Sequence, residues 1–340
     1  MFLGLASLSA AAQSAEALAL LRSTDDLVPE PPRPPDVIFK LGGQADSNQG
    51  QGYQGKVTWN ASRALTLFLS GNRSSLASTT EAPSPDGNTT ITTTTTVGGS
   101  YLFGTFDLGL EFDHTDMSDL LTARRYYLQP GFVAGSWRIG FEFSTRKTDF
   151  ETMRFNNLAL NTPTGPIFIS GYADLHLSDT GMGASVEYDG EVWRPYATYS
   201  HYNYGSFEGS TDITRIRTAN GDVSPLMFKA ISGRLVPRLE RVATSRLNRK
   251  AAYLDSTATV GIEANLSRSR WVVEANQDLD HLTNDVSNTF TGTAGWKVTR
   301  RFTVELQVGA TTSEALGTDR FVGLALTFRT RPSLLDLWSW

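Results

Sequence analysis

FVGLALTF, at residues 321–328, alternates strictly between bulky apolar residues and mostly small ones. Successive side chains of an extended chain point to opposite faces. One face holds the bulky side chains Val322, Leu324, Leu326 and Phe328. The other holds Phe321, Gly323, Ala325 and Thr327. In a soluble sandwich the second face would carry charge, yet here it is nearly neutral, so the rest of the chain must decide which face meets water.

The composition narrows the class of protein. The chain has 340 residues, a formal net charge of -5, 40% hydrophobic residues and no cysteine. Its mean hydropathy of -0.24 excludes a polytopic helical membrane protein, which needs several apolar runs of about 20 residues. The acidic balance gives no sign of nucleic-acid binding. A membrane β-barrel stays possible, because each strand places every second residue on a polar interior.

The N-terminus predicts an exported protein. Residues 1–15 contain a short apolar run with an A-x-A site at 10–12, which we interpret as a signal peptide, with a soluble helix as the alternative. Residues 16–35 include VPEPPRPP, a stiff extended spacer, and we interpret them as a short periplasmic segment.

Alternating stretches recur along the rest of the chain and predict fourteen β-strands. They are 36–43, 52–61, 64–71, 90–102, 105–113, 125–135, 137–145, 180–189, 191–202, 256–266, 270–278, 290–298, 301–310 and 321–328. Asp189-Gly190 is a strong hairpin signal between two of them. No fixed repeat of 20–50 residues is visible, which disfavours a solenoid or propeller.

The connections between these strands alternate between short and long. Every second link is only one to three residues, as at 62–63 and 299–300, whereas 72–89, 146–179 and 203–255 are very long. Tight periplasmic turns and long extracellular loops are typical of outer-membrane barrels. We therefore expect an all-β, antiparallel up-and-down transmembrane barrel over residues 36–328, with 14 strands most favoured and 12–16 possible, and a periplasmic tail at 329–340.

This fold would answer the opening question, since the bulky row would face lipid and the small row the lumen. A charge on the lipid face near the midplane costs about 2–4 kcal/mol, and almost none falls on the bulky faces. Five tryptophans lie near strand ends, where aromatic residues form membrane-interface girdles. They are Trp59, Trp137, Trp193, Trp271 and Trp296.

With this pattern the chain resembles a Gram-negative outer-membrane β-barrel protein of the porin-like kind. The resemblance covers residues 36–328 and implies location in the outer membrane, with lipid, lipopolysaccharide and the barrel-assembly machinery as partners. Such barrels usually end in an aromatic residue, and Phe328 and Trp340 are both candidates. A periplasmic or lipoprotein partner is a further possibility, while the oligomeric state is not predicted.

Signals for catalysis and for metal or cofactor binding are weak. Asp113, His114 and Asp116 lie where a strand leaves the membrane, and His201 ends another, which would suit a rim hydrolase but also an ordinary polar loop. DHTD at 113–116 and DGNT at 86–89 lack the ligand spacing of a calcium-binding EF-hand. We expect no enzyme activity, no metal and no cofactor.

The predicted lumen charges are the better functional candidates. They are Lys40, Lys56, Asp107, Glu111, Arg138, Glu142, Glu187, Arg194, Glu263, Glu274, Lys297 and Glu305. Glu263, Glu274, Lys297 and Glu305 lie on consecutive strands and should be neighbours. Such residues either form a selectivity lining for a polar or cationic solute or form salt bridges that tie the wall together.

The segment 224–252 is strongly basic and could enter the lumen as a plug that meets the acidic wall. The plug candidates are Arg234, Arg238, Arg241, Arg246, Arg249 and Lys250. The alternative is an external loop that contacts lipopolysaccharide or a partner.

The sequence thus favours an outer-membrane channel for a small polar or charged solute, with selectivity set by lumen charges and inserted loops. Two alternatives stay open. One is a non-conducting sleeve that holds a partner protein in an envelope assembly, such as a polymer exporter or an electron-transfer conduit. The other is an outer-membrane hydrolase.

Overall fold

A computed structural model describes residues 36–47, 50–76, 90–118, 121–162, 165–218, 221–223, 253–281, 284–299, 301–313 and 317–330. The predicted signal peptide and periplasmic segment, the plug candidates, Trp340 and the DGNT stretch lie outside these residues. Among the described residues, no helix is long and apolar enough to cross a membrane.

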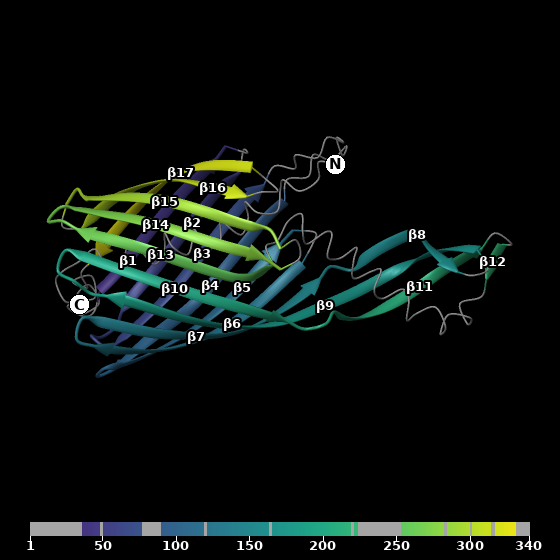
Figure 1. Cartoon of the computed structure of the whole chain (residues 1–340), viewed down its shortest axis with the longest axis horizontal. Helices are drawn as coiled ribbons and strands as arrows, with labels where there is room; N and C mark the ends of the chain where they lie inside the picture. The colour runs from purple at the N-terminus through teal and green to yellow at the C-terminus, as the bar shows by residue number, and fades with distance from the viewer. Residues whose placement is uncertain are drawn as a thin grey trace, which may run out of the picture.

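Fourteen antiparallel strands form a closed up-and-down barrel (Figure 1). They are β1 (Asp36–Asp46), β2 (Gln51–Asn60), β3 (Leu65–Leu76), β4 (Thr90–Phe103), β5 (Phe106–Met117), β6 (Leu121–Ala134), β7 (Trp137–Phe150), β9 (Gly165–Tyr188), β10 (Trp193–Tyr204), β13 (Leu254–Asn265), β14 (Ser269–Asp280), β15 (Val286–Lys297), β16 (Phe302–Ser313) and β17 (Gly317–Thr330). The barrel closes where β17 pairs with β1, with Phe328 opposite Phe39. The predicted fold class and strand count are confirmed.

Each predicted strand corresponds to one barrel strand, but most strands extend further at one end. β3 continues to Leu76 and β7 to Phe150, both at the end opposite the short turns. Asp36 and Thr330 both lie at the short-turn end, which is periplasmic in barrels of this kind. The opposite end is therefore the extracellular one.

An arm of β-sheet projects from the extracellular end (Figure 1). The outer half of β9 pairs with β8 (Met153–Thr162) and β11 (Glu208–Thr218), and β12 (Gly221–Val223) pairs with β11. The prediction that 146–179 and 203–223 are loops was therefore wrong. IFISGYADLHL at 167–177 alternates like the barrel strands, and Ile169, Ala173 and Leu175 are buried. A strand can continue beyond the membrane wherever a neighbour supplies the ladder hydrogen bonds.

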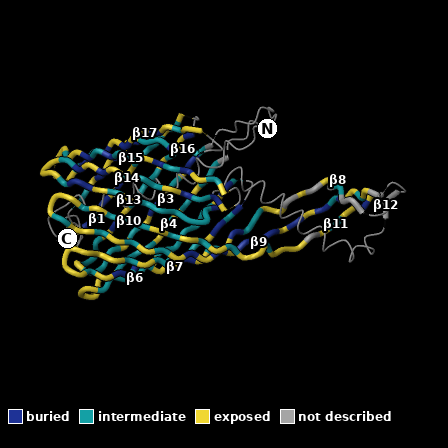
Figure 2. Tube along the Cα trace, in the orientation of Figure 1, coloured by how far each residue is buried: buried dark blue, intermediate teal, exposed yellow. Residues whose placement is uncertain are grey.

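The two faces of the barrel wall differ as the opening stretch predicted (Figure 2). Val322, Leu324, Leu326 and Phe328 are 40–51% exposed on the outer face, whereas Phe321, Ala325 and Thr327 are buried on the inner one. Phe321 fits there because it lies over Gly309 of the neighbouring strand, where a Cβ would overlap its ring. The bulky row therefore faces lipid, and the small row faces the lumen.

Candidate functional site

The strand registers place all twelve predicted lumen charges on the inner face. Lys40 is paired with Lys56 across β1 and β2, and Glu263 is paired with Arg194 across β10 and β13, always opposite the exposed apolar row. The same alternation identifies inner charges that the sequence analysis did not single out. These are Asp36, Asp46, Asp113, Arg125, Arg146, Asp179, Arg270, Asp278, Asp280, Asp319 and Arg329. Acids outnumber bases in the combined set.

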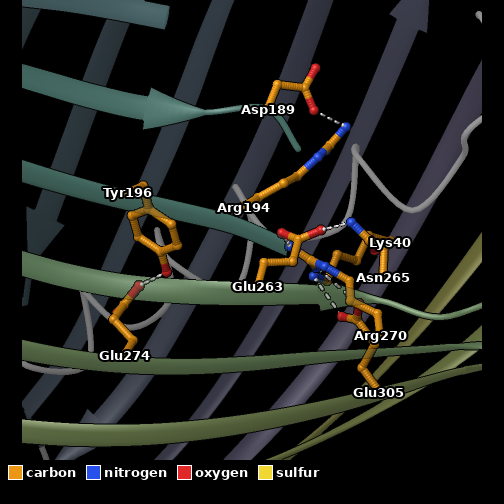
Figure 3. Close-up of polar contacts among 9 residues, drawn as sticks. All are labelled: Lys40, Asp189, Arg194, Tyr196, Glu263, Asn265, Arg270, Glu274 and Glu305. Atoms are coloured by element: carbon orange, nitrogen blue, oxygen red, sulfur yellow. Dashed lines mark hydrogen bonds and ion pairs between the residues drawn. The ribbon is translucent and has the colours of Figure 1, made fainter. Parts of the chain in front are cut away.

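Four inner residues form an ion-pair chain along the wall, which we call the inner ion-pair chain: Lys40, Glu305, Arg270 and Glu263 (Figure 3). Lys40 Nζ lies 3.1 Å from Glu305 Oε2, and Arg270 Nη2 lies 2.5 Å from Glu263 Oε2. Arg270 Nη1 lies 3.8 Å from Glu305 Oε1 and links the two pairs. All four side chains are at most 7% exposed, and two positive charges balance two negative ones.

The inner ion-pair chain crosses five strand boundaries, from β1 to β13. Where β15 lies between two of its members, a glycine leaves room for their side chains. Gly295 of β15 lies between Glu305 and Arg270, and a Cβ there would lie 3.3 Å from Glu305 Cγ and 3.7 Å from Arg270 Cβ. Glu263 and Glu305 were expected to be neighbours, and Arg270 brings them together. Arg270 is the first residue of the predicted strand 270–278. At that position, alternation alone does not indicate that the guanidinium is buried against two carboxylates.

Glu274 belongs to a separate contact. Tyr196 Oη donates a hydrogen bond of 2.6 Å to Glu274 Oε2 across β10, β13 and β14 (Figure 3). The tyrosine ring reaches that carboxylate by passing over Gly261, where a Cβ would collide with it. Lys297, the fourth expected neighbour, lies beside Thr303 at the periplasmic end of the wall.

Replacing Tyr196 with phenylalanine should lower the free energy of unfolding by about 1–2 kcal/mol, because Glu274 loses a charge-assisted hydrogen bond in a partly buried position. Urea titration followed by tryptophan fluorescence measures the change. Tyr199→Phe is the matched control, since Tyr199 is 53% exposed on the outer face of the same strand. An equal effect of the two substitutions would contradict the assigned hydrogen bond.

A second polar group, the outer arginine cluster, lies in the extracellular half of the wall and comprises Arg125, Arg146, Asp179 and Tyr204. Arg125 of β6 and Arg146 of β7 are directly opposite each other, and both reach Asp179 of β9, at 3.6 and 2.5 Å. Arg146 Nη2 donates to Tyr204 Oη at 3.3 Å, and Tyr204 Oη donates to the Leu254 carbonyl at 2.8 Å. The carboxylate thereby screens two adjacent guanidinium groups from each other.

Apolar residues continue this cluster to the root of the arm. Met117, Leu121, Ala123, Leu177 and Tyr253 form a buried core there, packed against Phe150, Tyr204 and Phe207. Burial among these side chains raises the pKa of Tyr253 to about 12. This quadrant of the extracellular mouth is thus packed and braced, in contrast to the polar wall elsewhere.

Several other predicted lumen charges form ion pairs or hydrogen bonds outside these two groups. Asp107 pairs with Arg138 at 3.3 Å, Arg194 with Asp189 at 2.7 Å, and Gln129 donates to Glu142 at 3.2 Å. Asp36 and Arg329 form an ion pair across the closing strands. Glu111, Glu187 and Lys56 lie on the same face at intermediate burial.

The five predicted interface tryptophans all lie on the outer face at the periplasmic ends of their strands. Trp59, Trp137, Trp193, Trp271 and Trp296 are 41–57% exposed. Trp271 and Trp296 contact each other edge to face, with ring centroids 6.0 Å apart. This placement suits a periplasmic aromatic girdle.

The structure does not assemble the candidate hydrolase residues into one site. Asp113 faces the lumen, whereas His114 and Asp116 face outward on the same strand, and His201 is exposed on the outer face of β10. Within the described part of the chain, no three metal-binding side chains converge on one point.

Comparison with known proteins identifies the fold. No family model and no curated protein matches the sequence. The structure is similar to that of the CymD monoaromatic hydrocarbon channel, with a TM-score of 0.50, 9% sequence identity and 87% of each chain covered. Lower scores link it to the KdgM porin (0.40; 9% identity; 86% of this chain and 99% of that one) and to Pseudomonas aeruginosa OpdK with vanillate (0.37; 8%; 87% and 97%).

The chain has the fold of an outer-membrane β-barrel protein. The closed barrel and its lipid-facing apolar belt place it in the outer membrane, as the sequence predicted. At 9% identity the likeness concerns the fold alone and says nothing about the solute.

Proposed function

We propose that the protein is an outer-membrane diffusion channel for small polar solutes with a preference for cations. The observation that carries this proposal is the excess of acidic over basic side chains on the lumen face of the strands that the structure describes. Threonines and serines fill much of the remaining inner wall, as at Thr92, Thr94 and Thr96 of β4. A polar lining with net negative charge raises the local concentration of cations and lowers that of anions.

The acids differ in how much they can contribute. Glu263 and Glu305 are neutralised by Arg270 and Lys40 inside the inner ion-pair chain, so their field in the lumen is small. Glu111, Glu142 and Glu274 are less buried and lie on three separate strands. We therefore assign the cation preference mainly to these three, and a bracing role to the inner ion-pair chain.

The test is conductance in a planar lipid bilayer across a KCl gradient. We expect stable open steps and a reversal potential of the sign that reports cation preference. Replacing Glu111, Glu142 and Glu274 together with glutamine should lower the ratio of potassium to chloride permeability about twofold. Lys56→Gln, which removes an inner positive charge, should change the ratio in the opposite direction.

The result that would overturn the channel proposal is a folded, heat-modifiable barrel that shows no open steps. Conductance without any effect of the triple substitution would instead overturn the assignment of selectivity to these residues. The alternative function, a non-conducting sleeve around a partner protein, is favoured only by the packed quadrant at the mouth, where Tyr253 and Leu121 are buried.

A further inference from the structure

A row of three basic side chains lies on the outer face of β5, β6 and β7, near the extracellular edge of the apolar belt. His114 is directly opposite Arg124, and Arg124 is directly opposite Lys147. Side chains in such positions have Cβ atoms about 5 Å apart. Arg124 is exposed, and the Lys147 side chain is 64% exposed. We call these three residues the outer basic row.

The inner face of β6 and β7 also carries two basic side chains that face each other, and their surroundings differ from those of the outer basic row. There, Arg125 and Arg146 are also directly opposite each other, but the carboxylate of Asp179 contacts both and screens one from the other. On the outer face, Arg124 makes no hydrogen bond or ion pair within the described residues. Lys147 Nζ lies 3.9 Å from Asp149 Oδ1, and that carboxylate lies closer to His176 Nδ1, at 2.7 Å. Like charges directly opposite each other destabilise a sheet, so an anion bound between Arg124 and Lys147 would relieve this repulsion.

The surroundings of the outer basic row indicate what kind of molecule carries that anion. On the membrane side lie Leu110 and Leu128, 59% and 42% exposed, and then the ring pair Phe112–Tyr126, with centroids 4.9 Å apart. The order from the membrane outward is therefore apolar side chains, aromatic rings and bases. Asp116 and Asp149 come only one row beyond the bases.

We propose that the outer basic row binds a phosphate group of a phosphorylated glycolipid in the outer leaflet, namely the lipid A portion of lipopolysaccharide. The guanidinium of Arg124 suits bidentate contact with phosphate, and Lys147 and His114 supply further donors. Acyl chains of the same lipid lie against Leu110 and Leu128. An anion without acyl chains gains nothing from that apolar surface, which is why the site favours a lipid over free phosphate.

Lipid retention by the folded full-length protein in detergent tests the proposal, with native mass spectrometry as the readout. The probes are lipid A with both phosphates, the same lipid without phosphate, and inorganic phosphate. We expect retention of the phosphorylated lipid, and about tenfold weaker retention in the double variant Arg124→Gln, Lys147→Gln. Arg320→Gln is the matched control, because Arg320 is an outward-facing arginine on β17 with Ala310 opposite it.

Three outcomes would overturn the proposal. The first is equal loss of lipid in the double variant and in Arg320→Gln. The second is equal retention of lipid with and without phosphate by the unsubstituted protein, a measurement that needs no variant to fold. The third is displacement of the lipid by millimolar inorganic phosphate, which would show a site for free phosphate. None of these depends on conductance, so the test is separate from that of the channel.

Discussion

Replacing Arg270 with methionine is expected to lower the free energy of unfolding by about 3–5 kcal/mol. Arg270 joins the two halves of the inner ion-pair chain, through contacts of 2.5 Å to Glu263 and 3.8 Å to Glu305. Without it, Glu263 stays buried but loses the guanidinium that balances its charge, while Glu305 keeps its contact with Lys40. A carboxylate left buried without a counter-charge costs several kcal/mol, far more than an ordinary surface substitution.

Urea-induced unfolding in detergent micelles, followed by tryptophan fluorescence and by the shift in gel mobility on heating, measures this loss. Arg194→Met is the matched control. Arg194 is an inner-face arginine that contacts the carboxylate of Asp189 at 2.7 Å. Because Asp189 is 60% exposed at a periplasmic turn, the expected loss of unfolding free energy is below about 1 kcal/mol. A second variant, Glu305→Gln, should also be destabilising because it removes the buried carboxylate that contacts both Lys40 and Arg270. If Arg270→Met and Arg194→Met unfold at the same urea concentration, the bracing role of the inner ion-pair chain is wrong.

The barrel itself could be predicted from local pattern because its determinants are local. Alternation in stretches such as 105–113 fixes which side chains face lipid, and turn residues such as Asp189-Gly190 fix where strands reverse. Each strand needs only its own residues to show both signals. The prediction was too short at the extracellular ends because the bulky outward row stops while the ladder continues, as in β7, where that row ends at Phe143 and the strand continues to Phe150.

The organisation of the polar lining could not be predicted in the same way. Lys40 and Glu305 are 265 residues apart in sequence, and their contact follows from closure of β17 onto β1. Alternation assigned both to the inner face but gave no registers between distant strands. Asp179 was assigned to a loop, so the outer arginine cluster was missed, although Arg125 and Arg146 have inner-face spacing relative to Tyr127 and Ser144.

A lysine in place of Leu324 should lower the free energy of unfolding by about 2–4 kcal/mol. Leu324 is the third of four bulky residues in the row from Phe328 to Val322 and is 51% exposed on the outer face. It therefore lies near the middle of the apolar belt, where an ammonium group cannot reach water without distorting the wall or the bilayer. The same equilibrium unfolding measurement, made in lipid vesicles, reports the cost.

A lysine on the inner face provides the control that separates lipid from lumen. Thr291 lies directly opposite Glu274 on the lumen side of β15, so Thr291→Lys adds a positive charge beside a carboxylate in a polar environment. We expect its effect on stability to be below about 1 kcal/mol, and we expect it to weaken the cation preference of the channel. Equal costs at positions 324 and 291 would mean that the two faces of the wall do not differ in solvent. The assignment of the bulky row of residues 321–328 to lipid would then be wrong, because the alternation of large and small residues would no longer indicate which face meets water.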